Sequence, residues 1–158
     1  MSTVPLTKQG AEQLKTELHR LKTVERPAVI NAISEARAQG DLSENAEYDA
    51  AKEKQSFIEG RIMEIESKLS AAQIIDPAQL DADGRVVFAA TVELEDLQDG
   101  KTVAYQIVGD DEADLETGKI SVSSPIARAL IGKYAGDVAE VQAPSGVREY
   151  EIIDVRYV

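Results

Sequence analysis

The stretch AQGDLSENAEYDAAKE, residues 38–53, decides the fold, because it joins two long segments that both have the apolar spacing of helices. Gly40 suits the left-handed conformation in which many helices end. Asp41 and Glu44 match the D-x-x-E spacing of a capping box at the start of a helix, and Ser43 competes with Asp41 as the N-cap. A connection this short forces the two helices to run antiparallel. The sequence therefore predicts an α-helical hairpin with an acidic tip.

The helix after this stretch carries a heptad seam, in which apolar and neutral side chains recur at alternating spacings of three and four. A seam with this spacing is typical of a helix that packs lengthwise on another helix. We therefore expect a coiled-coil partner along this helix. The seam consists of Tyr48, Ala51, Gln55, Ile58, Ile62, Ile65, Leu69 and Ala72.

The helix before the stretch has a looser stripe of the same kind, with Thr7 as its predicted N-cap. Pro27 lies inside this stripe, and an interior proline costs a helix about 3 kcal/mol. Because the stripe resumes after Pro27, we expect a kink at this proline and not a break. Each helix of about 30 residues is roughly 45 Å long. The stripe consists of Leu14, Leu18, Leu21, Val24, Ala28, Ile33 and Ala36.

The second half of the chain changes from helical spacing to the alternation that is typical of β-strands. Turn signals rich in Gly, Pro and Asp separate the alternating segments. Ser124 and Pro125 suit the N-cap and the first position of one short helix. We therefore expect a small antiparallel sheet with a single helix. The expected strands lie near residues 86–94, 103–107, 119–123, 138–143 and 148–158.

These patterns predict an α+β chain with two domains. The N-terminal antiparallel coiled-coil hairpin covers residues 1–75, with its acidic tip at residues 40–48. A linker that contains proline, glycine and aspartates follows at residues 76–84. The β-sheet domain covers residues 85–158.

The composition excludes several classes of function. Cysteine is absent, so disulfides and zinc-thiolate sites are excluded, and the single His19 argues against a catalytic triad or a multi-histidine metal site. Aromatic residues make up 4% of the chain, too few for a base-stacking platform. No apolar run is long enough to cross a bilayer, and the N-terminus has no apolar signal region. We therefore expect a cytoplasmic protein that has no membrane among its partners.

The negative charge is concentrated in the second half of the chain. The net charge is −12, of which residues 76–158 contribute −10 and residues 1–75 only −2. A chain with this charge does not bind nucleic acid through bulk electrostatics. The two halves are therefore expected to contact different partners, and the acidic half a basic protein surface.

The tip residues allow two interpretations. In the first, Asp41, Ser43 and Glu44 only cap the second helix, where carboxylates are favoured by the helix dipole. In the second, the carboxylates at the end of a rigid rod are delivered into a deep cavity of another molecule. Carboxylate oxygens suit Mg²⁺, but two of them are an incomplete site, so a partner has to supply the other ligands.

Four segments of the chain resemble the Gre transcript cleavage factors, bacterial elongation factors that act on RNA polymerase. The tip segment, with DLSENAEY followed by AAKE, is similar to the GreA type of that family. The resemblance extends from Pro5 to the final strand. The four segments are GDLSENAEYDAAKE at residues 40–53, GRVVFAATV at 84–92, VGDDEAD at 108–114 and ISVSSPIARALIGK at 120–133.

The resemblance implies an accessory factor that is not itself an enzyme. It implies that the hairpin enters the secondary channel of RNA polymerase, where Asp41 and Glu44 help to bind a Mg²⁺ ion of the polymerase and Ser43 supports them. The polymerase then cleaves its backtracked nascent RNA, so that an arrested complex resumes synthesis. The isolated factor holds no cofactor in this account.

The resemblance also implies the remaining contacts. Arg37 and Lys52 are the expected contacts to the 3′ end of the nascent RNA, although Lys52 lacks the bidentate geometry of an arginine. The second domain is expected to be related to the FKBP fold and to dock on the coiled coil at the channel rim through Ser123, Ser124 and Pro125. A monomeric, DNA-binding transcription factor of the cytoplasm is the corresponding expectation.

Two other functions compete with this one. An FKBP-like domain with a coiled-coil clamp is compatible with a chaperone or prolyl isomerase, but the second half of the chain has few aromatic residues to line a proline pocket. An independent magnesium nuclease conflicts with the incomplete ligand set of the tip. The flank charges of the coiled coil, including Arg37 and Lys52, also have an ordinary role as solvated surface.

Overall fold

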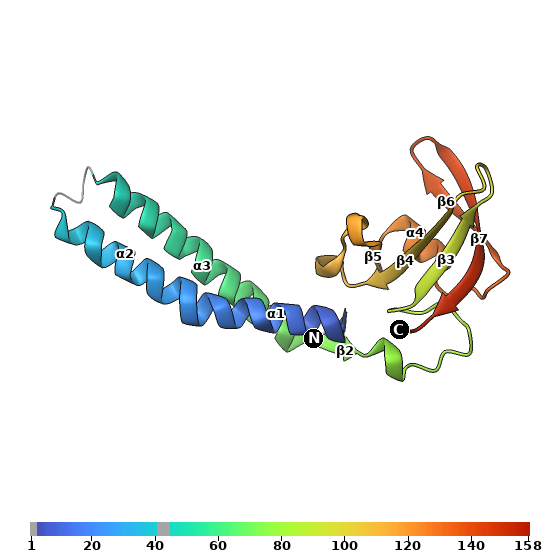
Figure 1. Ribbon diagram of the computed structural model, residues 1–158, viewed down its shortest axis with the longest axis horizontal. Coiled ribbons are helices and arrows are strands. Elements are labelled where there is room, and N and C mark those ends of the chain that lie inside the picture. The colour runs from blue at the N-terminus through green and yellow to red at the C-terminus, as the bar shows by residue number, and fades with distance from the viewer. Residues whose placement is uncertain (1–2, 41–44) are drawn as a thin grey trace. The chain divides into compact units, whose positions relative to one another are not determined.

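The protein is described by a computed structural model that covers residues 3–40 and 45–158 (Figure 1). It divides into two compact units, which we call the helical unit, Ala11–Ala72, and the sheet unit, Thr3–Gly10 with Gln73–Val158. The prediction of an α+β chain, with a long N-terminal helical region before a β-sheet domain, is confirmed. None of the helices in the described ranges combines the length and apolar character that a membrane span needs.

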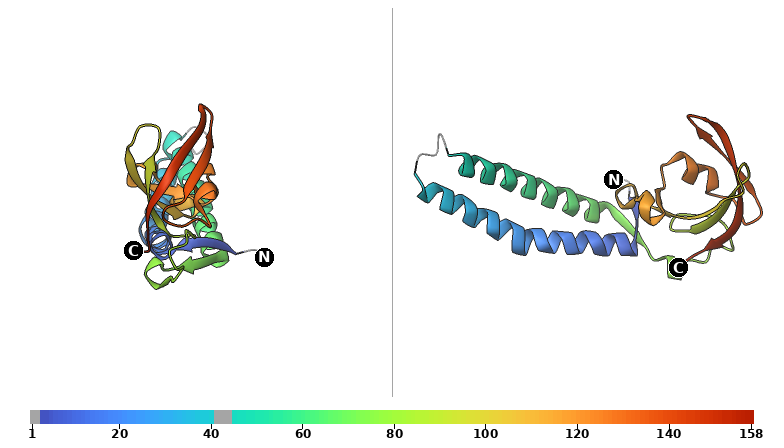
Figure 2. Two further views of the ribbon diagram at one scale, coloured as in Figure 1. Left: turned by 90° about the vertical axis from the view of Figure 1, so that its right-hand side faces the viewer. Right: turned by 45° about the horizontal axis from the view of Figure 1, so that its top comes forward.

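The helical unit is built from an almost continuous helix and a second long helix. The first consists of α1 (Lys8–Arg20), the π-helical segment η1 (Leu21–Glu25) and α2 (Arg26–Ala38). The second is α3 (Ala46–Ala71). Figures 1 and 2 show α2 and α3 side by side.

Ion pairs show that α2 and the segment before it run antiparallel to α3. Arg26 pairs with Glu59 through two hydrogen bonds of 2.7 and 2.8 Å. Nearer to the N-terminus, Glu17 pairs in the same bidentate way with Arg61, at 2.7 and 2.8 Å. The partner on α3 thus moves toward the C-terminus as the residue on the first helix moves toward the N-terminus.

The heptad seam predicted on α3 is confirmed as the buried face of that helix. Ile58, Ile62 and Ile65 are at most 3% exposed, and Ile58 and Ile62 pack with Val29. The remaining seam residues are partly buried. Burial of branched side chains along this seam is the main stabilisation of the helix pair, because single helices in water are only marginally stable.

The stripe predicted on the first helix is wrong at two positions. Val24 is 55% exposed and Ala28 is exposed, whereas Val29 is buried. The cause is η1, in which the N–H of Arg26 bonds to the carbonyl of Leu21, five residues back. A π turn holds an extra residue, so the buried face moves by one position. Pro27 is the second residue of α2, in its first turn after η1.

The sheet unit contains a five-stranded sheet in the order β5-β4-β3-β7-β6. The predicted strands exist, but β3 begins later than expected. Its antiparallel pairs are β3–β4, β3–β7 and β6–β7. The strands are β3 (Thr91–Asp96), β4 (Thr102–Val108), β5 (Lys119–Ser121), β6 (Val138–Ala143) and β7 (Gly146–Arg156).

The predicted all-antiparallel sheet is wrong for one pair, because β4 and β5 run parallel. Two 3-10 turns, Asp110–Glu112 and Leu115–Thr117, lie in the connection between these strands. This connection carries the chain back, so that β5 runs in the direction of β4. A further sheet of two strands, β1 (Val4–Thr7) and β2 (Ala72–Ile75), was absent from the sequence prediction.

The core of the sheet unit lies between the sheet and α4 (Pro125–Leu130). Ala127 and Leu130 of α4 are fully buried with Leu94, Ile107 and Ile152 of the strands. Before β3, residues 85–90 are not a strand although their side chains alternate. Ala89 has a φ of 77°, which interrupts extended structure in this segment. A further 3-10 turn, Pro77–Gln79, lies in the predicted linker.

Candidate functional site

Three of the predicted tip residues, Asp41, Ser43 and Glu44, lie outside the described residues. The structure describes the chain on both sides of them, up to Gly40 and again from Asn45.

Asn45 ties the two flanks together. Its Oδ1 accepts a hydrogen bond from the N–H of Tyr48 at 3.0 Å, which makes Asn45 the N-cap of α3. Its Nδ2 donates to the carbonyl of Ala36 at 2.7 Å, in the last turn of α2. The prediction that Asp41 or Ser43 caps this helix is wrong. Asn45 is itself a preferred N-cap residue, and the D-x-x-E pattern concealed it.

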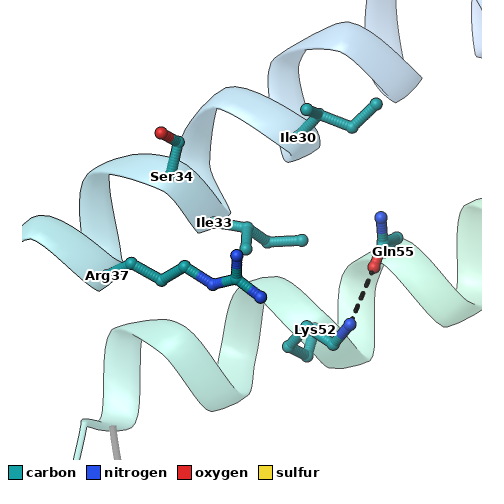
Figure 3. A pocket seen from close by; sticks show the side chains of 6 residues that line it. All are labelled: Ile30, Ile33, Ser34, Arg37, Lys52 and Gln55. Atoms are coloured by element: carbon teal, nitrogen blue, oxygen red, sulfur yellow. Dashed lines mark hydrogen bonds between the residues drawn. The ribbon is translucent and has the colours of Figure 1, made fainter. Parts of the chain in front are cut away.

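Arg37 and Lys52 come together next to this tie. They line a cavity of about 290 Å³ between α2 and α3, together with Ile30, Ile33, Ser34 and Gln55. Figure 3 shows Arg37 reaching from α2 across to the side of Lys52. The Lys52 Nζ donates to Gln55 Oε1 at 3.3 Å. The two predicted RNA contacts are therefore neighbours.

Tyr48 supports Arg37 from the start of α3. The Arg37 guanidinium carbon lies 6.0 Å from the centroid of the Tyr48 ring, at the outer limit of a cation–π contact. The heptad pattern marked Tyr48 only as a seam residue.

The cavity combines two cationic side chains with two isoleucines. Arg37 and Lys52 bring two positive charges, and Ser34 and Gln55 bring neutral polar groups. The described residues that line it include no carboxylate. Such a surface can hold a phosphate by charge, while the isoleucines contact apolar groups next to that phosphate in the same ligand. Sequence reasoning assigned Gln55 only to the heptad seam and missed Ser34, which belongs to no pattern.

The predicted docking residues begin α4 in the sheet unit. The Ser124 hydroxyl accepts a bond from the N–H of Ala127 at 3.3 Å and donates to the carbonyl of Ser121 at 2.7 Å. Ser124 is thus the N-cap, with Pro125 in the first turn, as predicted. Ser123 and Pro125 are exposed.

Asp110 holds the segment before α4 in place. It accepts hydrogen bonds from Ser123 Oγ at 2.7 Å and from the Ser121 hydroxyl. These two hydroxyl bonds, Ser121 first, hold the pKa of the Asp110 carboxyl below its usual range. Sequence reasoning missed Asp110 and Ser121, because their contact joins two elements of the connection between β4 and α4.

Within the described ranges, no group of three or more His, Cys, Asp or Glu side chains is arranged to hold a metal ion. The acidic residues for which the sequence predicts a shared Mg²⁺ lie outside those ranges.

Comparison with protein families gives a match in each half of the chain. Residues 4–74 match the family model described as transcription elongation factor, N-terminal. Residues 81–157 match the model described as transcription elongation factor, GreA/GreB, C-terminal. Together the two models cover nearly the whole sequence.

Individual relatives agree with these models. The chain is 77% identical to transcription elongation factor GreA of Ralstonia nicotianae, over 99% of both chains. It is 66% identical to the factor of the same name from Neisseria meningitidis, over 100% of both chains. The crystal structure of GreA factor homolog 1 from Thermus thermophilus is 32% identical, covers 98% of this chain and 99% of that chain, and has a TM-score of 0.43.

Proposed function

The chain belongs to the GreA/GreB family of transcription elongation factors, and we propose that it stimulates RNA polymerase to cleave its own backtracked nascent RNA. The GreA type inferred from the tip segment is confirmed by relatives of that name at 66–77% identity. The chain is thus an accessory elongation factor. The mechanism below is our proposal.

The helical unit is the part that we propose to enter the secondary channel of the polymerase. Its two antiparallel helices form a narrow, well-packed rod, which suits delivery of a few side chains into a deep channel. The observation that carries this proposal is Asn45, which joins the ends of α2 and α3 on either side of residues 41–44. This tie fixes the two described flanks of the acidic segment to each other.

Asp41 and Glu44 are proposed to complete a Mg²⁺ site of the polymerase. A hard cation takes oxygen ligands and keeps several waters, so two added carboxylates stabilise an ion that the polymerase already partly holds. When bound, such an ion would lower the pKa of the attacking water, and Asp41 and Glu44 would orient that water with Ser43 in support. In this account the isolated protein needs no cofactor.

The cavity that Arg37 and Lys52 line is the proposed contact to the extruded RNA 3′ segment. Its positive charge stands close to the tip, on an otherwise acidic protein. The surface that begins α4 is the proposed docking site on the coiled coil at the channel rim. There Asp110 and Ser121 hold Ser123, and Pro125 is exposed. Four expectations remain predictions. They are the relation of the sheet unit to the FKBP fold, the monomeric state, DNA binding and the cytoplasmic location.

The competing functions have less support. Neither the matched families nor the relatives point to a chaperone or a prolyl isomerase. An independent nuclease differs from the proposed accessory factor in one property, which is that it cleaves RNA in the absence of polymerase.

A cleavage assay on backtracked elongation complexes tests the proposal. We expect the protein to shorten the nascent RNA from its 3′ end only when polymerase and Mg²⁺ are both present. The free RNA of the same sequence, with the protein and Mg²⁺ alone, is the control. The proposal is contradicted if the protein cleaves that free RNA, or if it does not stimulate cleavage in the complex.

A further inference from the structure

The proposed function uses Asp110 of the motif VGDDEAD, residues 108–114, but leaves Glu112 of the same motif unexplained. Glu112 ends the 3-10 turn after β4. The Glu112 carboxylate accepts a bond from the N–H of Thr7 at 3.0 Å and another from the N–H of Gly109 at 2.9 Å. The Thr7 hydroxyl donates a third. One side chain therefore joins two segments that are 105 residues apart in sequence.

Two glycines make room for this carboxylate and the strand beside it. A Cβ at Gly10 would overlap the Glu112 carboxylate, and a Cβ at Gly109 would lie 2.9 Å from the carbonyl oxygen of Pro5. Glycine is the least favourable helix residue after proline, yet Gly10 lies in the first turn of α1. The Glu112 side chain gives the physical reason for a glycine there.

The same contacts begin helix α1. Thr7 is the predicted N-cap, and its hydroxyl oxygen accepts a bond from the N–H of Gly10 at 3.0 Å. The negative charge of Glu112 stands beside the first turn of the helix, where the helix dipole favours an anion. Thr7 is 3% exposed and Leu6 is 6% exposed. Bonds shielded from water in this way are stronger than the same bonds on an open surface.

These contacts lie where the chain passes from the sheet unit into the helical unit. The sheet unit includes Thr3–Gly10, so α1 starts in the sheet unit and continues into the helical unit as one helix. We propose that Glu112, Thr7 and Gly10 form a clasp that holds the start of α1 in the sheet unit, which makes Glu112 a positioning residue for stimulated RNA cleavage. The effect on cleavage rests on the proposed function, whereas the clasp itself rests on the contacts above.

A double-mutant cycle tests the clasp without polymerase. Gly10→Ala displaces the carboxylate, so the Thr7 amide should exchange with solvent about tenfold to a hundredfold faster, the factor expected for a lost charge-assisted hydrogen bond. Glu112→Ala should give the same increase. In the Glu112→Ala background, Gly10→Ala should add nothing, because the group that it displaces is gone.

The exposed acid Glu116 gives the matched control. Glu116→Ala removes the same charge from the same connection and should leave Thr7 exchange unchanged. If Gly10→Ala and Glu112→Ala add independently, or if Glu112→Ala leaves Thr7 protected, the clasp is wrong.

Titration of the factor in the cleavage assay tests the positioning role. Glu112→Ala should lower the maximal cleavage rate about tenfold to a hundredfold, as expected when catalytic groups are misplaced from a distance. The factor concentration for half-maximal stimulation should stay the same, because the docking surface is intact. A merely structural role instead lowers the folded fraction, which raises that concentration and leaves the maximal rate unchanged.

The outcomes separate the two proposals. If the unaltered protein does not stimulate cleavage, the proposed function fails, and the exchange cycle alone decides the clasp. If the exchange cycle succeeds but Glu112→Ala and Gly10→Ala keep the full maximal rate, the positioning role is overturned.

Discussion

At the scale of the residue, Asn45 joins the two described flanks of the tip. It caps α3 and also bonds to Ala36 at the end of α2. Asn45→Ala should lower the free energy of unfolding by about 1–2 kcal/mol, since it removes an N-cap and a second hydrogen bond. Urea unfolding followed by circular dichroism measures this loss.

Two further variants separate the contributions of Asn45. Asn45→Asp keeps an oxygen that can cap α3 but loses the donor to Ala36. Its stability should therefore lie between that of the unaltered protein and that of Asn45→Ala. Asn31→Ala, on the exposed surface of α2, is the control and should change little. An Asn45→Ala protein as stable as the Asn31→Ala protein would mean that the tie is unimportant.

Asp96 gives a prediction about pH. It is 7% exposed, and Arg148 donates two hydrogen bonds to its carboxylate. These bonds, with one from the N–H of Gln98, lower the pKa of the Asp96 carboxyl in the folded protein. The ionised carboxylate therefore stabilises the fold above the ordinary carboxyl pKa of about 4, and this contribution is lost as the pH falls through the lower folded pKa.

Thermal melts between about pH 7 and pH 2 check this sign, because the range spans the ordinary carboxyl pKa. Asp96→Asn should melt at a lower temperature than the unaltered protein at neutral pH, and the difference should shrink in acid. Asp81→Asn makes the same chemical change at an exposed position and should leave the melting profile almost unaltered. A difference that grows on acidification contradicts the assignment.

At the scale of the element, the π segment η1 explains an exception to the heptad pattern. Leu21 and Val29 face α3 eight residues apart, where a regular heptad has seven. Deleting Val24 restores seven and converts the segment to α-helix, but it also places Pro27 inside a regular helix. We expect this deletion to cost about 3 kcal/mol of unfolding free energy, the usual penalty of an interior proline.

A rescue variant makes the prediction specific to Pro27. Deletion of Val24 combined with Pro27→Ala should recover the lost stability, because the helix then has its heptad spacing and a complete set of N–H donors. Pro27→Ala alone is the matched control. If the single deletion is as stable as the unaltered protein, the π segment is not an accommodation of the proline.

The elements also show what the sequence can and cannot predict. The seam on α3 was predictable because its burial follows directly from a local period. The shifted stripe around Val29 was not, because one extra residue in η1 becomes visible only against the partner helix. Strand alternation located β4 and β5 but gave no information about their direction. The short β1 and β2 pair had too few residues to show a period.

Some residues of the candidate site were likewise predictable from the sequence, and others were not. Ser124 and Pro125 were predictable as a helix start from capping chemistry alone. The neighbourhood of Arg37 and Lys52 follows from the antiparallel register. Asp110 and Glu112 could not be interpreted, because their partners are distant in sequence. The roles of Asp41 and Glu44 rest on the family resemblance.

At the scale of the whole molecule, the protein separates its tasks between two units. The helical unit carries the tip and the cationic cavity, and the sheet unit carries the proposed docking surface and most of the negative charge. The central claim is that the tip carboxylates act as half of a metal site whose other half belongs to the polymerase.

The most direct test of this claim is the cleavage rate of a backtracked polymerase complex with Asp41→Ala and Glu44→Ala combined. The matched control, Glu47→Ala with Asp49→Ala, removes two acids from the first turn of α3. We predict that the tip variant binds polymerase but loses stimulation by about a hundredfold or more, as when a metal-orienting group is removed, and that the control keeps it. Full stimulation by the tip variant would contradict the account.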